Sequence, residues 1–232
     1  GIRLGARVSS ARALLANAGI SSPGVKLHGA GFIVTPEQAV TLGLGKDPAV
    51  SDIIRPYRNG RDINQKPRGV LVIDLFGLTE SEVRKKYPAI FQHVLTNVKP
   101  ERDENRRATY RNNWWIFGEP RKHLRPAIDG LPWFVATTET AKHRIFDVIP
   151  KGTRPDNKLI CFALSDWRAL SILHSEVHFR WFKANSAKIG MYEGDAVYPK
   201  GQCFDPFPFP DLTDKPALKS RLDELGERLD AQ

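Results

Sequence analysis

The sequence has few of the residues on which small secreted domains and metal-binding domains depend. Its 232 residues include two cysteines, Cys161 and Cys203, and no CxxC pair. Neither a disulfide framework nor a cysteine zinc site is therefore predicted, and a reducing cytoplasmic location is expected. No run of about 18 apolar residues occurs, so no membrane contact is expected either.

Acidic residues are also scarce relative to basic ones. Lys and Arg number 35 against 26 Asp and Glu, which gives a formal net charge of +9. Such an excess favours a polyanionic partner, and nucleic acid is the leading candidate. Because many basic proteins have other partners, the positions of the charges must support this interpretation.

The common motifs for phosphate and metal chemistry are missing. GAGF at 29–32 fits neither a dinucleotide fingerprint nor a P-loop and indicates a turn. His174 and His178 have the spacing of metal ligands on one helix, but no third ligand accompanies them, and packing is expected instead. Asp74 is a single carboxylate inside an apolar strand, where a neighbouring donor should satisfy it. We predict neither a metal ion nor a catalytic residue in this chain.

Hydrophobic periodicity predicts an α+β fold, in which helices flank a mixed β-sheet. Apolar runs indicate buried strands at 69–77 and 158–165. Three helices are predicted. The first starts at Pro36 and is capped by Thr35, the second spans 78–95 and starts with a capping box from Thr79 to Glu82, and the third spans 166–183.

Two helical stripes are predicted to be buried. The residues of the first stripe are Trp167, Leu170, Leu173, Val177 and Trp181, and those of the second are Leu218, Leu222, Leu225 and Leu229. The second stripe belongs to an amphipathic C-terminal helix at 213–232. We expect it to follow a main domain at 51–212, which is itself preceded by a connector at 1–50.

Two stretches concentrate the positive charge. Residues 55–68 hold five basic residues and one acid among turn-forming residues, which predicts a basic loop. Residues 99–125 hold eight Lys or Arg against four acids, interleaved with Tyr110, Trp114 and Trp115. Alternation of arginine and aromatic side chains is typical of phosphate binding combined with stacking on bases.

Several ordered motifs together resemble one family of enzymes. The most specific are WW-x-F-G-E-P-R at 114–121, K-x-R-x-F at 142–146 and L-x-S-x-x-H-x-x-W at 173–181. The others are LxANxGISSPGVKLHGAGF, IRPYRNGRDI, YPAIFQHVL, VKPERDENRR and CFDPFPFP. From about residue 10 to 212, the chain resembles the C-terminal target-recognition half of adenine-specific DNA methyltransferases, in particular the fused restriction-modification enzymes of the MmeI-like kind.

The resemblance implies a specificity domain for double-stranded DNA in a bacterial enzyme. In that family an upstream module binds S-adenosylmethionine and flips adenine against an Asn-Pro-Pro-Tyr loop. No Asn-Pro-Pro occurs here, and the chain starts with Gly. We therefore expect a fragment that begins after the methyltransferase core, has no cofactor of its own and partners that core. By itself it should be inactive.

The segment TTETAKHRIF at 137–146 places basic residues between two apolar runs. If it were one strand, alternation would put Thr140, Lys142 and Arg144 on one face and His143 on the other. In the resembled family this segment reads base edges, and Lys and Arg suit guanine O6 and N7. Thr140, Lys142, His143 and Arg144 are thus the candidates for base readout, although charged residues on an edge strand can also serve only to deter aggregation.

The basic loops are the candidates for phosphate contact, since each neutralised phosphate adds to affinity. The residues expected to contact the DNA backbone are Arg55, Arg58, Asn59, Arg61, Arg102, Arg106, Arg107, Arg111, Arg121 and Lys122.

Two other functions stay open. One is a self-contained nuclease or other nucleic-acid-processing enzyme with Asp74, Glu80 or His174 in its site, although no clustered carboxylate motif supports it. The other is a module that binds RNA or single strands through the tryptophan-rich basic run.

Overall fold

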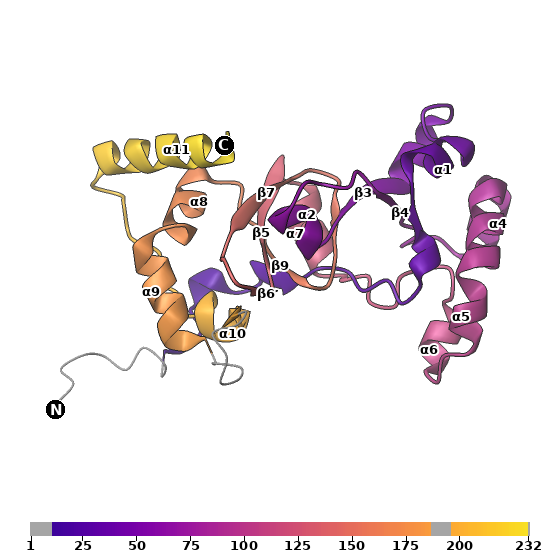
Figure 1. Cartoon of the computed structure of the whole chain (residues 1–232), viewed down its shortest axis with the longest axis horizontal. Helices are drawn as coiled ribbons and strands as arrows, with labels where there is room; N and C mark the ends of the chain where they lie inside the picture. Colours follow the sequence, from indigo (N-terminus) through magenta and orange to yellow (C-terminus); the bar gives the residue numbers. More distant parts are fainter. Residues whose placement is uncertain (1–10, 187–195, 232) are drawn as a thin grey trace. The chain divides into compact units, whose positions relative to one another are not determined.

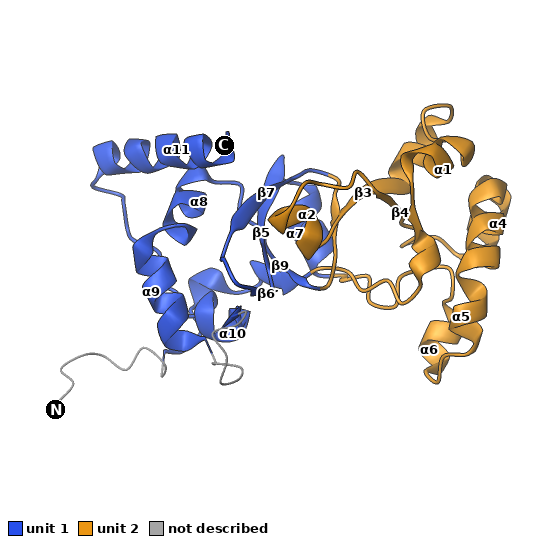
Figure 2. Cartoon of the chain, in the orientation of Figure 1, with its two compact units in different colours: residues 1–23, 123–151, 158–232 blue, residues 24–122, 152–157 orange. Residues whose placement is uncertain are grey.

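The chain folds into two units, each built from segments that are distant in sequence. The computed structural model describes residues 11–186 and 196–231. Unit 1 comprises residues 1–23, 123–151 and 158–232, and unit 2 comprises residues 24–122 and 152–157 (Figure 2). This division does not fall at the boundaries expected from the sequence, residues 50 and 212, which stay a prediction. Each sheet pairs strands that are distant in the chain, which sequence order does not reveal.

Unit 1 is organised around a four-stranded antiparallel sheet with the order β1-β9-β5-β7 (Figure 1). Its strands are β1 (Ser21–Pro23), β9 (Leu159–Phe162), β5 (Trp133–Thr138) and β7 (Phe146–Pro150). A two-stranded ribbon pairs β6 (Thr140–Ala141) with β10 (Ala196–Val197). The apolar run at 158–165 is thus a buried strand, as predicted.

The helices of unit 1 flank this sheet (Figure 1). They are α7 (Leu124–Asp129), α8 (Trp167–Leu173), α9 (Glu176–Asn185), α10 (Lys200–Cys203) and α11 (Pro216–Asp230), and a 3-10 turn, η2, spans Leu15–Asn17. Val135, Ile160 and Phe162 of the sheet pack in one core cluster with Leu170 of α8 and Phe182 of α9. Phe146, the first residue of β7, belongs to the same cluster.

The predicted helix at 166–183 is two helices, because α8 ends at Leu173 and Ser175 caps the start of α9 through its side chain. The apolar stripe is therefore interrupted. Leu170 and Leu173 are buried and Trp181 is half-buried, but Val177 is 71% exposed. The prediction that Val177 lies in the stripe is wrong, since the break at His174 and Ser175 rotates the second helix relative to the first.

The C-terminal helix α11 packs on α8 (Figure 1). Gly226 is buried against the carbonyl of Trp167, the Ser171 hydroxyl donates to the Leu222 carbonyl over 2.6 Å, and Arg168 pairs with Asp223 over 3.1 Å. Leu218, Leu225 and Leu229 are partly exposed. The leucine seam is therefore not the buried surface that we expected.

Unit 2 contains a second sheet with the order β2-β4-β3-β8, in which β3 and β8 run parallel and the other pairs antiparallel. Its strands are β2 (Ile33–Val34), β4 (Leu71–Ile73), β3 (Ile54–Arg58) and β8 (Arg154–Pro155). The apolar run at 69–77 supplies the central strand β4. Parallel and antiparallel pairing in one sheet, with separate flanking helices, confirms the α+β class.

Short helices surround the sheet of unit 2. They are α1 (Pro36–Thr41), α2 (Gly60–Asn64), α3 (Glu80–Lys86), α4 (Pro88–Asn97), α5 (Lys99–Asp103) and α6 (Ala108–Asn112), with 3-10 turns η3 (Ala30–Phe32) and η4 (Pro48–Asp52). Capping boxes at Thr35 and Thr79 are present as predicted. The predicted helix at 78–95 divides at Pro88, because a proline disfavours helical backbone at the preceding Tyr87.

Within the described part of the chain, no helix is both long and apolar enough to cross a membrane.

Candidate nucleic-acid interface

The segment TTETAKHRIF forms the turn of a hairpin in unit 1 rather than one strand. Strands β5 and β7 pair antiparallel with Thr137 opposite Phe146. Residues 139–145 leave the sheet, and two of them form the short strand β6. The expected alternation of Thr140, Lys142 and Arg144 on one face is therefore wrong, because a chain reversal takes the place of a continuous strand.

Three of the four candidates for base readout are exposed on this loop. Thr140 lies on β6, and Lys142 and His143 lie in the bend that follows. All three side chains carry donors, and His143 also offers an acceptor in its neutral form. The structure thus brings together Thr140, Lys142 and His143 on one solvent-facing loop of unit 1, which we call the recognition loop, residues 139–145.

Arg144 differs from the other three because its guanidinium lies inside unit 1. Nη1 donates to the carbonyl of Thr138 and, over 3.2 Å, to the hydroxyl of Thr137, and Nη2 donates to the carbonyl of Ala196 over 2.7 Å. The guanidinium also lies over the rings of Phe182 and Tyr198. Burial lowers the pKa of Arg144 to about 10, so the side chain keeps its charge at neutral pH.

In unit 2, the first basic stretch forms the connection from β3 into α2. Asn59 caps α2 and accepts hydrogen bonds from the backbone amides of Arg61 and Asp62. Asp62 is buried and pairs with Arg68, whose Nη2 lies 2.8 Å from Oδ2. Burial by itself raises the pKa of Asp62, but hydrogen bonds from Arg68 and Asn59 outweigh that effect and hold the pKa at about 2.

This connection presents three of the expected backbone contacts. Arg61 is exposed, and Arg58 is partly exposed. Arg55 is partly exposed and pairs with Asp52, 3.1 Å away. The loop is thus basic at its surface, while the Asp62–Arg68 pair inside it fixes its backbone.

The second basic stretch of unit 2 contains a buried arginine that sequence reasoning assigned to DNA. Arg102 is 1% exposed, and its guanidinium donates to the carbonyls of Leu27, Tyr110 and Ile116. These bonds tie α5 to two other segments of unit 2. This placement gives Arg102 a structural role, and we leave it out of the proposed interface.

The remaining basic residues of this stretch reach the surface. Arg106 and Arg107 are exposed where α5 leads into α6, and Arg107 donates to the Tyr110 hydroxyl over 3.0 Å. Arg111 is partly exposed and donates to the Asn105 carbonyl over 2.6 Å.

Arg121 and Lys122 follow at the end of the stretch. Lys122 is exposed. Arg121 is partly exposed, has a left-handed backbone with φ of 55°, and pairs with Glu119 over 2.9 Å. That pairing reduces the charge that Arg121 offers to a phosphate.

The aromatic residues between these arginines belong to the core of unit 2. Trp114 is buried and meets Phe91 edge to face, and the indole of Trp115 donates to the Leu78 carbonyl over 2.9 Å. Tyr110 is buried beside His28. The expectation that these rings stack on bases is wrong, because the alternating pattern reflects one face of the chain directed inward and one outward.

The residues considered for nuclease or metal chemistry have structural partners. Asp74 is buried and pairs with Arg154, whose Nε lies 2.6 Å from Oδ2, as expected for a satisfied carboxylate. His174 bonds the backbone of Phe146, and His178 bonds the Tyr198 hydroxyl over 3.0 Å. Among the described residues, no group of three His, Cys, Asp or Glu side chains is placed to hold a metal ion.

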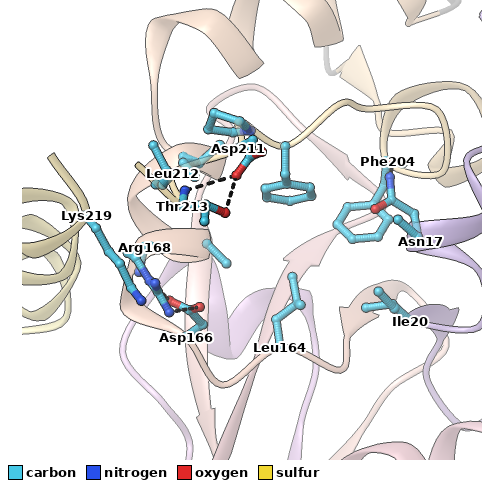
Figure 3. A pocket seen from close by; sticks show the side chains of 15 residues that line it. Asn17, Ile20, Leu164, Asp166, Arg168, Phe204, Asp211, Leu212, Thr213 and Lys219 are labelled. Atoms are coloured by element: carbon cyan, nitrogen blue, oxygen red, sulfur yellow. Dashed lines mark hydrogen bonds and ion pairs between the residues drawn. The ribbon is translucent and has the colours of Figure 1, made fainter. Parts of the chain in front are cut away.

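A groove of about 460 Å³ lies in unit 1 beside the start of α8 (Figure 3). Ile20, Leu164 and Phe204 line it, and both of its carboxylates are engaged, since Asp166 binds Arg168 and Asp211 accepts from Thr213. The groove is apolar and carries no cluster of basic groups for phosphate. It is therefore not part of the candidate interface.

Sequence reasoning missed the residues that fix the recognition loop. Thr137 donates from its hydroxyl to the Ile145 carbonyl over 2.6 Å, and the backbone of Glu139 bonds Lys158 and Tyr198. The bonds of Glu139 depend on segments that lie farther along the chain. A motif search has no means of finding them.

Comparison with known proteins gives a match in structure but none in sequence. No family model and no curated protein matches the chain. Among solved structures, the fold matches part of a restriction-modification enzyme, and at low sequence identity such a likeness shows the fold alone. The matched structure is the type IIL restriction-modification enzyme MmeI in complex with DNA, with a TM-score of 0.62 and 14% identity. The match covers 87% of this chain and 26% of that enzyme, so the chain spans about a quarter of its length.

Proposed function

We propose that this chain recognises a target sequence in double-stranded DNA for an N6-adenine methyltransferase or a fused restriction-modification enzyme. The observation that carries the proposal is the fold match to an enzyme solved with DNA, which extends over 87% of the chain. The net charge of +9 and the motifs shared with target-recognition regions support the same conclusion.

Base readout is assigned to the recognition loop of unit 1. Lys142 and His143 are exposed side chains that donate hydrogen bonds, and guanine presents two acceptors, O6 and N7, in the major groove. Thr140, exposed on β6, can donate or accept. The expected readout is therefore a guanine facing Lys142 or His143, with Arg144 supporting the loop from within.

Phosphate contact is assigned to the exposed basic residues of unit 2. Arg61, Arg106, Arg107 and Lys122 are exposed, and Arg58 is partly so. Arg55, Arg111 and Arg121 already hold a neighbouring group and are weaker candidates, and Asn59 contributes through the shape of the α2 cap. Such contacts set the position of a duplex without reading its sequence.

Methyl transfer belongs, in this proposal, to a separate methyltransferase domain that binds S-adenosylmethionine. That domain, the cofactor and a cytoplasmic location rest on the family resemblance. A self-contained nuclease has less support, because Asp74 is occupied by Arg154 and His174 by the Phe146 backbone. A single-strand platform has less support because Trp114 and Trp115 are core residues.

The test is selection of bound duplexes from a random DNA library by the purified chain, followed by sequencing. Enrichment of a defined motif, together with weaker binding to single-stranded DNA and RNA of equal length, is the expected result. Equal binding to all three nucleic acids, or no enriched motif, would contradict the proposal. Incubation of the same chain with plasmid and magnesium should leave the plasmid intact.

A further inference from the structure

Arg144 is a partly buried cation whose hydrogen bonds go to uncharged groups. The oxygen atoms that its guanidinium bonds belong to two carbonyls and one hydroxyl, and aromatic rings of Phe182 and Tyr198 lie beside it. A charge placed inside a protein is costly unless it is well paired and hydrogen-bonded. An apolar side chain would fill the same space without that cost, so packing alone does not account for an arginine at this position.

The three bonded groups belong to the segments that hold the recognition loop. Thr137 and Thr138 end strand β5, where the loop begins, and Arg144 itself lies where the loop ends. Ala196 belongs to β10, the strand that pairs with β6 inside the loop. A single guanidinium therefore joins both ends of the loop to the strand that supports its middle.

Other bonds fix the rest of the loop and leave two side chains outside. The amide of Glu139 donates to the Lys158 carbonyl over 2.7 Å, and its carbonyl accepts from the Tyr198 amide over 2.8 Å. Thr140 and Ala141 pair with β10. Lys142 and His143 follow these fixed residues directly and are exposed.

We propose that Arg144 is a positioning residue that holds the recognition loop in the conformation in which Lys142 and His143 read a base edge. This inference rests on the proposed function. A side chain that reads a base must be held to within about 0.5 Å of its productive position, because a looser donor also accommodates the wrong base. Loss of Arg144 should therefore reduce discrimination between sequences, while binding through the exposed arginines of unit 2 persists.

The experiment uses the full chain with Arg144→Gln and Arg144→Lys. Each variant is taken through selection from a random duplex library, through titration with one unrelated duplex, and through hydrogen exchange of the amides in residues 139–145. Arg144→Gln should lower the enrichment of the preferred motif about tenfold, within the range that one base contact contributes. Its affinity for the unrelated duplex should change less than about twofold, and its loop amides should exchange faster.

Arg144→Lys separates positioning from a general need for positive charge. A lysine keeps the charge but cannot bond three groups in one plane, so it should recover only part of the enrichment and of the exchange protection. Two controls bracket this result. Lys142→Ala should lose enrichment without faster exchange, and Arg125→Gln, which removes another buried arginine of unit 1, should change neither the motif nor the loop.

Several outcomes would overturn the inference. Unchanged enrichment in Arg144→Gln would do so, whether or not its loop exchanges faster. A change in which base is preferred, with an unaltered loop, would show that Arg144 contacts the base directly. If both Arg144 variants lose all duplex binding along with their circular dichroism, Arg144 is needed only for folding. If the wild-type chain enriches no motif, the proposed function fails and this inference fails with it, whereas the other outcomes leave that function standing.

Discussion

The two units employ arginine in opposite ways. In unit 1, the recognition loop carries one arginine, and its guanidinium is turned inward onto carbonyl and hydroxyl groups. In unit 2, Arg61 in the first turn of α2 and Arg106 and Arg107 before α6 are exposed to solvent. Under the proposed function this difference would serve two requirements, since reading a base needs fixed geometry and contacting a phosphate needs mainly charge.

Each unit also buries an arginine that a count of basic residues would assign to its surface. Arg102 in unit 2 and Arg144 in unit 1 both satisfy backbone carbonyls where segments meet. Planar guanidinium groups suit this role because their donors point in several directions within one plane. Basic composition therefore overstates the number of groups available to DNA.

The largest effect is expected from breaking the buried ion pair of unit 2. Asp74→Ala removes the carboxylate that pairs with the buried Arg154, which should lower the free energy of unfolding of unit 2 by about 3 to 5 kcal/mol. Hydrogen exchange of unit 2 peptides measures the effect. The double variant Asp74→Ala with Arg154→Met should regain part of the loss, and a single variant as stable as the wild type would contradict the prediction.

The second largest effect is expected from lowering the pH, which should destabilise unit 1 before unit 2. Burial and the nearby Arg144 lower the pKa of His178 in unit 1 from 6.5 to about 4. Between these two pH values His178 is protonated in the unfolded chain but neutral in folded unit 1. Unit 1 should therefore lose up to about 3 kcal/mol of stability as pH falls from about 6.5 to 4.

Unit 2 should respond to acid only at lower pH. The lowered pKa of Asp62 stabilises unit 2 above about pH 4, and this contribution, about 1 to 2 kcal/mol after allowance for the partly exposed Arg68, is lost as pH falls toward 2. Hydrogen exchange at several pH values, corrected for intrinsic rates, compares the units. A pKa of His178 near 6.5, measured by NMR titration, would contradict the prediction that unit 1 loses stability at a higher pH than unit 2.

Replacing the two kinds of candidate contact should give different losses in DNA binding. Lys142→Ala should cost about 1 to 3 kcal/mol of discrimination at one base pair and leave affinity for unrelated DNA nearly unchanged. Sequencing of duplexes selected from a random library measures this loss. If Lys142→Ala selects the same sequences as the wild type, Lys142 does not read a base.

The smallest effect is expected from a single phosphate contact in unit 2. Arg106→Gln should weaken binding to all duplexes about equally and reduce the slope of log affinity against log salt by about one. Titrations from low to moderate salt measure the slope. Arg102→Lys is the contrasting change, because Arg102 is buried and should affect stability before it affects the slope. If the affinity of the wild type does not depend on salt, the basic residues of unit 2 do not bind DNA through phosphate contacts.

Local signals in the sequence predicted many elements correctly. Thr35 with Pro36, and Thr79 with Glu82, marked helix starts because a cap involves residues only a few positions apart. The apolar runs marked β4 and β9 for a similar reason. Pro88 marks the division between α3 and α4. From the sequence, one continuous helix is predicted there because the helical pattern continues on both sides of the proline.

The sequence by itself determined the class of fold, the basic charge, the caps, and the location of the candidate loop between two apolar strands. Tertiary structure alone decided the division into two units, because β1 pairs with β9 and β3 with β8, and the strands of each pair are far apart in the sequence. It also decided which basic residues face solvent. Lys142 and Arg144 differ by two positions in one motif, yet one is exposed and the other is enclosed, because Ala196, Phe182 and Tyr198 meet the loop from segments far along the chain.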